Sequence, residues 1–107
     1  MYREILHEWL NELGFAVIAL ESGIGASKCI KNEHPIACFI DLFMDNKEGL
    51  ETIIELRKIP NKPLLIAMSS STEQLPVAKL LGADETLAKP LILTSIAALF
   101  RNLGILR

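Results

Sequence analysis

The order of hydrophobic and polar residues along the chain predicts five helices that alternate with four strands. Apolar residues at three- and four-residue spacing, with charged residues between them, are typical of helices that bury one face. Short apolar runs without polar alternation are typical of strands that are covered on both faces. The segments with helical spacing are Tyr2–Leu13, Ser22–Glu33, Leu50–Ile59, Leu75–Leu81 and Leu93–Leu103. The segments that read as strands are Phe15–Leu20, Ile36–Leu42, Leu64–Met68 and Glu85–Ala88.

This alternation of helices and strands favours an α/β fold with a parallel sheet and helices on both of its faces. Right-handed crossovers make such a fold a doubly wound sandwich. Functional residues in doubly wound sheets lie beyond the carboxyl ends of the strands. We expect a single domain over residues 1–107, because a chain of 107 residues fits one hydrophobic core and leaves no room for two.

Composition and charge exclude several classes of protein. Half of the residues are hydrophobic, which is too many for a disordered chain. The net charge is −2 and the basic residues are scattered, so no nucleic-acid-binding surface is expected. The longest apolar runs, such as Leu64–Met68, are too short to cross a membrane, and Met1–Lys28 lacks the pattern of a secretory signal. We therefore expect a cytoplasmic protein, in which Cys29 and Cys38 are small core residues rather than a disulfide framework.

Three successive predicted strands end in residues that suit phosphoryl chemistry. Asp41 stands near the end of one apolar strand, Ser69 ends the next and Lys89 follows the last. A carboxylate can attack phosphorus and form an acyl phosphate. A hydroxyl and an ammonium group can bind the phosphoryl oxygens and offset their charge. Each residue alone also fits a structural role, as a turn former, a loop residue or a surface lysine, but the three together favour a site.

The same residues stand in three motifs that carry a family resemblance. The motifs are Ile-Asp-Leu-Phe-Met-Asp-Asn-Lys-Glu-Gly-Leu-Glu-Thr (40–52), Ile-Ala-Met-Ser (66–69) and Gly-Ala-Asp-Glu-Thr-Leu-Ala-Lys-Pro (82–90). In this order and spacing they resemble the receiver domain of two-component response regulators, over essentially the whole chain. The resemblance implies a flavodoxin-like sandwich that takes a phosphoryl group from a histidine kinase or a phosphotransfer protein. It implies a signalling domain, with at most self-catalysed phosphorylation and dephosphorylation, rather than an enzyme.

The resemblance also implies roles for individual residues at this site. Asp41 is expected to be the phosphoacceptor, and Ser69 the hydroxyl residue that follows the phosphoryl group during activation. Lys89 is expected to pair with the phosphate, and Pro90 to follow a cis peptide bond. Gly49 is expected to supply the turn into the third helix.

The sequence departs from the family pattern where the family binds Mg²⁺. The family's first strand ends in two acidic residues that hold the metal, and this sequence has no counterpart of that strand. The remaining expected ligands are Asp41 and the backbone carbonyl of Phe43, so we expect weak Mg²⁺ binding and impaired phosphorylation. Asp45 and Glu48 fit solvated loop positions better than metal ligands. Thr86 stands where the family often has an aromatic switch residue.

The missing strand also changes what is expected of the sheet, because that strand is central in the family's order. The four recognisable strands could form a rearranged sheet, two chains could pair or exchange elements, or the sequence could be a truncated form of a longer protein. We expect a homodimer; light scattering from a stable monomer at micromolar concentration would contradict this. The alternative function is a degenerate receiver that acts as a protein-interaction or dimerisation module without phosphorylation. A hydrolase with an aspartyl-phosphate intermediate is disfavoured, because no cap domain or second acid at usable spacing is present.

Overall fold

The computed structural model describes residues 2–20, 23–42 and 48–105. These residues belong to two compact units. The larger unit covers Leu20–Lys89, and the smaller one joins Met1–Ala19 with Pro90–Arg107. None of the helices in the described ranges is long and apolar enough to cross a membrane.

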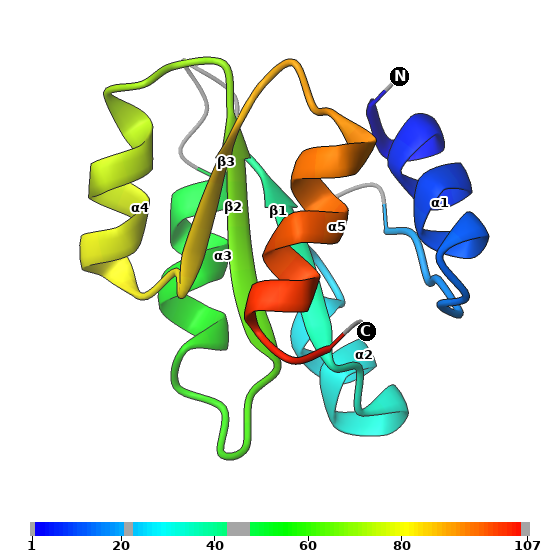
Figure 1. Ribbon diagram of the computed structural model, residues 1–107. Coiled ribbons are helices and arrows are strands. Elements are labelled where there is room, and N and C mark those ends of the chain that lie inside the picture. The colour runs from blue at the N-terminus through cyan, green and yellow to red at the C-terminus, as the bar shows by residue number, and fades with distance from the viewer. Residues whose placement is uncertain (1, 21–22, 43–47, 106–107) are drawn as a thin grey trace. The chain divides into compact units, whose positions relative to one another are not determined.

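The larger unit is built on a sheet of three parallel strands, drawn as arrows in Figure 1. They are β1 (Ala37–Asp41), β2 (Leu64–Ser69) and β3 (Glu85–Ala88), in the spatial order β1-β2-β3. In the register of the sheet, Asp41 lies beside Met68, and Ser69 lies beside Ala88. The carboxyl ends of all three strands therefore lie at one edge of the sheet, as expected for parallel strands.

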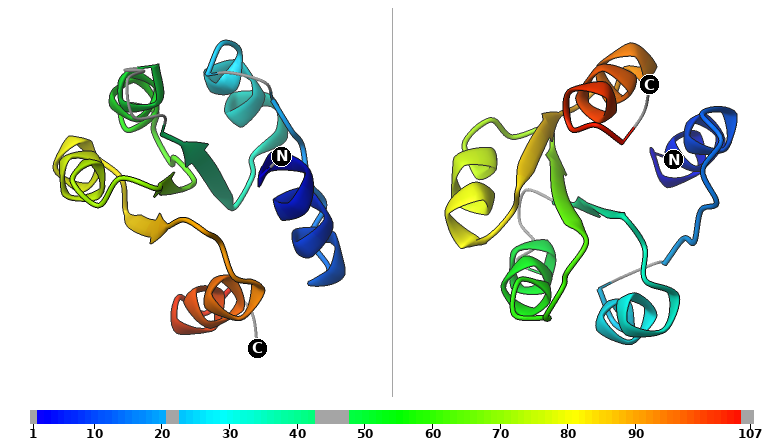
Figure 2. Two further views of the ribbon diagram at one scale, coloured as in Figure 1. Left: turned by 90° about the horizontal axis from the view of Figure 1, so that it is seen from above. Right: turned by 60° about the horizontal axis from the view of Figure 1, so that its bottom comes forward.

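Three helices of the larger unit follow one another along one face of this sheet (Figure 2). They are α2 (Ala26–Glu33), α3 (Glu48–Leu56) and α4 (Gln74–Leu81). Their apolar faces and alternate residues of the strands form a single core, because apolar surface is stabilised by removal from water. The members of this core are Ala26, Ile30, Ile40, Leu42, Ile53, Leu56, Leu65, Ala67, Ala78 and Ala83.

The smaller unit contains the two terminal helices, α1 (Tyr2–Glu12) and α5 (Leu93–Asn102). The aromatic rings of Phe15 and Phe100 meet edge to face, with their centroids 5.2 Å apart and their planes at 76°. Phe100 is 2% exposed. Edge-to-face packing of this kind suits the charge distribution of aromatic rings and adds to the stabilisation from burial.

The structure confirms the α/β class, the five predicted helices and three of the four predicted strands. The predicted strand at Phe15–Leu20 is wrong, because these residues form no strand and the described sheet consists of β1, β2 and β3. A strand needs the hydrogen bonds of a neighbouring strand, and apolar residues alone do not provide them. Ile18 and Leu20 are 55% and 41% exposed, so this run is also not the buried one that its composition indicates.

Both cysteines are free thiols in the larger unit. Cys38 packs against the core from β1. Burial, with a smaller contribution from Cys29, raises the pKa of the Cys38 thiol to about 11. A thiol with such a pKa stays neutral and unreactive near neutral pH, which agrees with a packing role for Cys38.

Candidate functional site

Asp41 and Lys89 form an ion pair at the carboxyl-terminal edge of the sheet. The Lys89 Nζ atom lies 2.5 Å from Asp41 Oδ1, and the two side chains are 10% and 31% exposed, respectively. Oδ1 is itself buried and has no hydrogen-bond partner of good geometry among the described residues, so the short contact is an ion pair rather than an aligned hydrogen bond. The charge of the carboxylate is therefore balanced mainly by a positive group that solvent scarcely reaches.

The strand order explains why a lysine can fill this position. Lys89 follows β3, whereas Asp41 ends β1, and β2 lies between the two strands. Strands lie about 4.8 Å apart, so the side chain has to reach across the end of β2, which its long stem allows. The backbone N–H of Lys89 donates to the carbonyl of Ser69 at 2.9 Å, which continues the β2–β3 ladder and holds the lysine at this edge.

Ser69 ends β2 at the same edge, but its hydroxyl bonds away from the sheet. The residue is 1% exposed. Its Oγ donates to Oε1 of Gln74 at 2.7 Å and accepts the backbone N–H of Ser71 at 3.0 Å. In this structure the Ser69 hydroxyl therefore belongs to the turn into α4, and its hydrogen bonds do not go to Asp41.

The other residues named from the sequence are distributed differently. Thr86 is half-buried in β3 beside Ala67, and Pro90 belongs to the smaller unit. Phe43 and Asp45 lie outside the described residues.

The expected magnesium site is incomplete in the part of the chain that the structure describes. Asp41 is the one described member of the expected ligand pair. Within the described ranges, no group of three or more His, Cys, Asp or Glu side chains is arranged to hold a metal ion. Glu48, which the sequence places in a loop, is instead the first residue of α3, and its Oε1 accepts the Gly23 N–H at 3.0 Å. The described side chains therefore do not fit a Mg²⁺ ion by themselves.

Gly49 brings the start of α3 close to the backbone of Asp41. It is buried in the first turn of the helix. A Cβ atom at this position would lie 2.6 Å from Leu42 Cδ2 and 2.9 Å from the backbone oxygen of Asp41. The expectation that Gly49 supplies the turn into the helix is thus replaced by a steric reason: only glycine allows this close approach.

Replacement Gly49→Ala is expected to lower the free energy of unfolding by about 2 kcal/mol, because the added methyl group overpacks a site bounded by backbone. Urea denaturation followed by circular dichroism measures the change. Glu51→Ala, at an exposed position of the same helix, is the control and should change the stability by less than about 0.5 kcal/mol. Equal effects of the two variants would contradict the steric role of Gly49.

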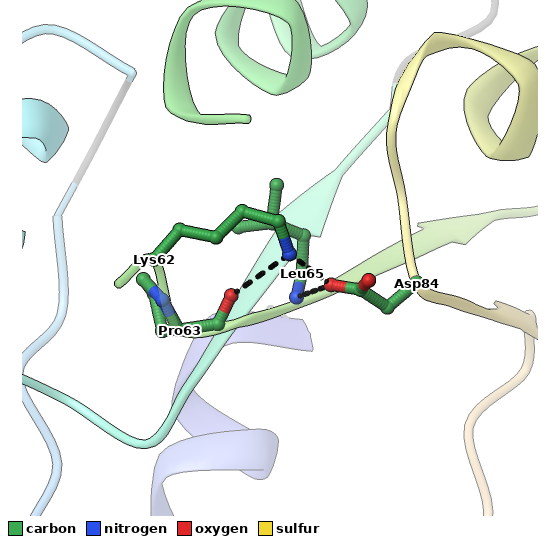
Figure 3. Close-up of polar contacts among 4 residues, drawn as sticks. All are labelled: Lys62, Pro63, Leu65 and Asp84. Atoms are coloured by element: carbon green, nitrogen blue, oxygen red, sulfur yellow. Dashed lines mark hydrogen bonds and ion pairs between the residues drawn. The ribbon is translucent and has the colours of Figure 1, made fainter. Parts of the chain in front are cut away.

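Asp84, for which the sequence indicated no role, ties β3 to the start of β2 (Figure 3). Its Oδ2 accepts the backbone N–H of Leu65 at 2.8 Å and the Lys62 ammonium at 2.6 Å. The Lys62 Nζ also lies 3.4 Å from the carbonyl of Pro63. These contacts stand at the amino ends of the strands, opposite the edge with Asp41. No local pattern in the sequence signals this bond, because Leu65 lies 19 residues before Asp84 along the chain.

The surroundings of Asp84 hold its carboxylate in the charged form. Burial by itself raises the pKa of Asp84. The hydrogen bond from Leu65 and the ammonium of Lys62, with a smaller contribution from Lys79, outweigh burial and leave the pKa below its usual value. A carboxylate whose pKa falls on folding stabilises the folded state at a pH above its unfolded pKa, and this stabilisation is lost as the pH falls through the folded pKa.

Replacement Asp84→Asn is expected to cost about 1 kcal/mol near neutral pH, because an amide oxygen can still accept the Leu65 N–H but carries no charge for Lys62. The side chain is 35% exposed, so solvent keeps the effect small. Below about pH 4 the difference from the wild type should begin to shrink, because Asp84 is then protonated in the unfolded chain while it stays charged in the folded one. It should be lost as the pH falls through the lower pKa of the folded protein, where Asp84 is protonated in both states. Urea denaturation across this range tests the prediction, with Glu55→Gln as the control. A difference that does not change with pH would contradict it.

Comparisons with known proteins identify a family for this chain. Residues 1–101 match the family model of the response regulator receiver domain. The response regulator MprA of Mycobacterium sp. (strain KMS) is 33% identical over 103 residues, which cover 94% of this chain and 45% of that protein. The chain spans less than half the length of such curated relatives.

Two solved structures are also similar. A signal receiver domain from Bermanella marisrubri has a TM-score of 0.83 at 25% identity, over 94% of this chain and 87% of that one. A response regulator from Burkholderia pseudomallei, solved with a phosphorylated aspartic acid, a calcium ion and citrate, has a TM-score of 0.77 at 27% identity, over 91% of this chain and 58% of that one. The parallel sheet agrees with this fold, and the match over residues 1–101 shows that the chain belongs to the response regulator receiver domains, the signalling domains of two-component systems.

Proposed function

We propose that this chain is a single receiver domain that accepts a phosphoryl group on Asp41 in a two-component phosphorelay. Receiver domains interact with histidine kinases or phosphotransfer proteins, and such a protein is the proposed donor. The observation that carries the proposal is the pair of Asp41 and Lys89, whose charged atoms lie 2.5 Å apart at the carboxyl edge of the sheet. The phosphorylated aspartic acid in the similar Burkholderia pseudomallei structure supports it.

The chemistry follows from the two side chains. A carboxylate oxygen of Asp41 attacks the phosphorus of the donor, and the bond between phosphorus and the donor atom breaks, with its electron pair leaving on the donor. The product is an acyl phosphate on Asp41. The Lys89 ammonium, already beside the carboxylate, stabilises the negative charge on the phosphoryl oxygens.

A second candidate function is an interaction or dimerisation module without phosphoryl transfer. The observation that favours it is an apolar surface on α4, where Val77 and Leu80 are 43% and 84% exposed and stand one helical turn apart. Neighbouring exposed apolar side chains on a helix are typical of contact surfaces. The homodimer expected from the sequence remains a prediction for either function.

The two candidates are separated by locating the phosphoryl group. The protein is incubated with acetyl phosphate, with and without Mg²⁺, and its intact mass is measured. Borohydride then reduces the acyl phosphate, and peptide mass mapping locates the modified residue. The proposal expects one phosphoryl group on Asp41. The absence of any adduct, under conditions in which the same donor labels another response regulator, or an adduct on another residue, would overturn it and favour the interaction module.

A further inference from the structure

The side chain of Gln74 holds the hydroxyl of Ser69 at the start of α4. A serine hydroxyl has one hydrogen to donate, and here it points to Gln74 Oε1 at 2.7 Å. The same oxygen accepts the Ser71 N–H at 3.0 Å. Because Ser69 is 1% exposed, solvent offers no ready replacement for either partner. A buried hydroxyl that loses its acceptor is destabilised, so this hydrogen bond fixes where the proton points.

Once Asp41 carries a phosphoryl group, the phosphoryl oxygens compete with Gln74 as acceptors of the hydrogen bond from the Ser69 hydroxyl. Ser69 stands one residue beyond Met68, the register partner of Asp41, on the neighbouring strand. Its backbone carbonyl also accepts the N–H of Lys89, whose ammonium pairs with Asp41. Phosphoryl oxygens are strong, charged acceptors, and a hydrogen bond to a charged acceptor is about twice as strong as one to a neutral amide. One proton cannot serve both acceptors.

Gln74 also belongs to the helix that would be affected if the Ser69 hydroxyl turned from Gln74 to a phosphoryl group. It is the first residue of α4, and the preceding residue, Glu73, makes no side-chain cap hydrogen bond to the helix. The other end of α4 is tied to a different segment, because Arg57 Nη1 donates to the carbonyl of Leu81 at 2.9 Å. The Ser69–Gln74 bond is thus a side-chain tie between β2 and the amino end of α4.

We propose that Gln74 is a positioning residue that holds the Ser69 hydroxyl away from Asp41 in the unphosphorylated protein. A phosphoryl group on Asp41 withdraws the hydroxyl, and the amino end of α4 is released from β2. The inference rests on the proposed function of Asp41 and on the role that the resemblance implies for Ser69, and it adds the residue that opposes the phosphorylated state.

The test measures the affinity of the protein for beryllofluoride, which mimics a phosphoryl group on an aspartate, with Mg²⁺ at one fixed concentration. Gln74→Met keeps the length of the side chain but removes the acceptor, so the affinity should rise about fivefold. Gln74→Glu keeps an acceptor oxygen and should show no gain. In a Ser69→Ala background, Gln74→Met should change the affinity by less than about twofold, because the hydroxyl through which Gln74 acts is gone.

A second measurement detects the release of α4. Backbone amide signals of residues 75–77 are compared by NMR before and after the beryllofluoride adduct forms. In the wild type these signals should move on adduct formation. In Gln74→Met they should already be displaced, before the adduct forms, along the line that joins their free and adduct positions in the wild type. A merely structural bond would shift these neighbouring signals without following that line. If Gln74→Met does not fold, Gln74→Ala removes the same acceptor and takes its place.

The outcomes separate the inference from the function on which it rests. A wild-type protein that forms the adduct, with no gain in Gln74→Met or with a gain that persists in Ser69→Ala, overturns the role of Gln74 and leaves Asp41 as the acceptor. A wild-type protein that forms neither the beryllofluoride nor the phosphoryl adduct overturns the function of Asp41, and the role of Gln74 with it. A gain that requires Ser69 supports both.

Discussion

The variant Asp41→Asn is expected to form no phosphoryl adduct at all under conditions that label the wild type. An amide is not a nucleophile toward phosphorus, whereas its shape is that of the carboxylate, so β1 should keep its place in the sheet. Intact mass after incubation with acetyl phosphate measures the result. Asp84→Asn is the matched control, because Asp84 is also an aspartate beside a strand but lies at the opposite end of the sheet. It should be labelled like the wild type.

The same variant is expected to be less stable by about 1 to 2 kcal/mol. Lys89 is 10% exposed and loses the carboxylate beside it, which is costly for a charged group held away from water. The partial exposure of Asp41 keeps the cost below that of a fully buried pair. Far-ultraviolet circular dichroism should show an unchanged fold. An adduct that survives in folded Asp41→Asn would place the acceptor elsewhere.

The second large effect is expected from Lys89→Met. Adduct formation should slow by about a hundredfold, because the phosphoryl oxygens lose the positive group that lies beside Asp41. Lys89→Arg keeps the charge and should recover part of the rate, although its planar guanidinium does not have the shape of an ammonium group. The initial rate of mass gain in acetyl phosphate is the measurement.

The control for this experiment is Lys79→Met, which removes an exposed lysine from α4. It should react at the wild-type rate. Both variants lose one positive charge, so a difference between their rates reports the loss of the ammonium beside Asp41. A wild-type rate in Lys89→Met would contradict the role of Lys89 in phosphoryl transfer.

The strands that carry the site were predictable because their signal is local. The apolar runs of β1, β2 and β3 mark buried strands, and the rule that parallel strands end at one edge already brings Asp41 and Lys89 together. The segment Phe15–Leu20 carries the same local signal but forms no strand, because pairing depends on a partner strand that a local pattern does not describe. The pattern of burial is thus easier to predict than the pattern of pairing.

The contacts of Ser69 and Gly49 could not be predicted from the sequence, for a different reason. Ser69 was identified by its chemistry, but its attachment to Gln74 depends on how the turn after β2 brings two side chains together. Glutamine carries no charge or nucleophile to mark it in a sequence. The close approach of Gly49 to the backbone of Asp41 depends in the same way on how α3 packs, which only the folded chain displays.

The reach of Lys89 across the end of β2 has a consequence for the accuracy of folding. Successive side chains of a strand point to opposite faces, so a shift of β3 by one residue against β2 would turn the lysine away from Asp41. The same shift would break the bond between the Lys89 N–H and the Ser69 carbonyl. A chain whose strands paired in the wrong register would therefore lack the Asp41–Lys89 ion pair and the phosphoryl chemistry that depends on it. The ion pair thus also favours the native register of the sheet.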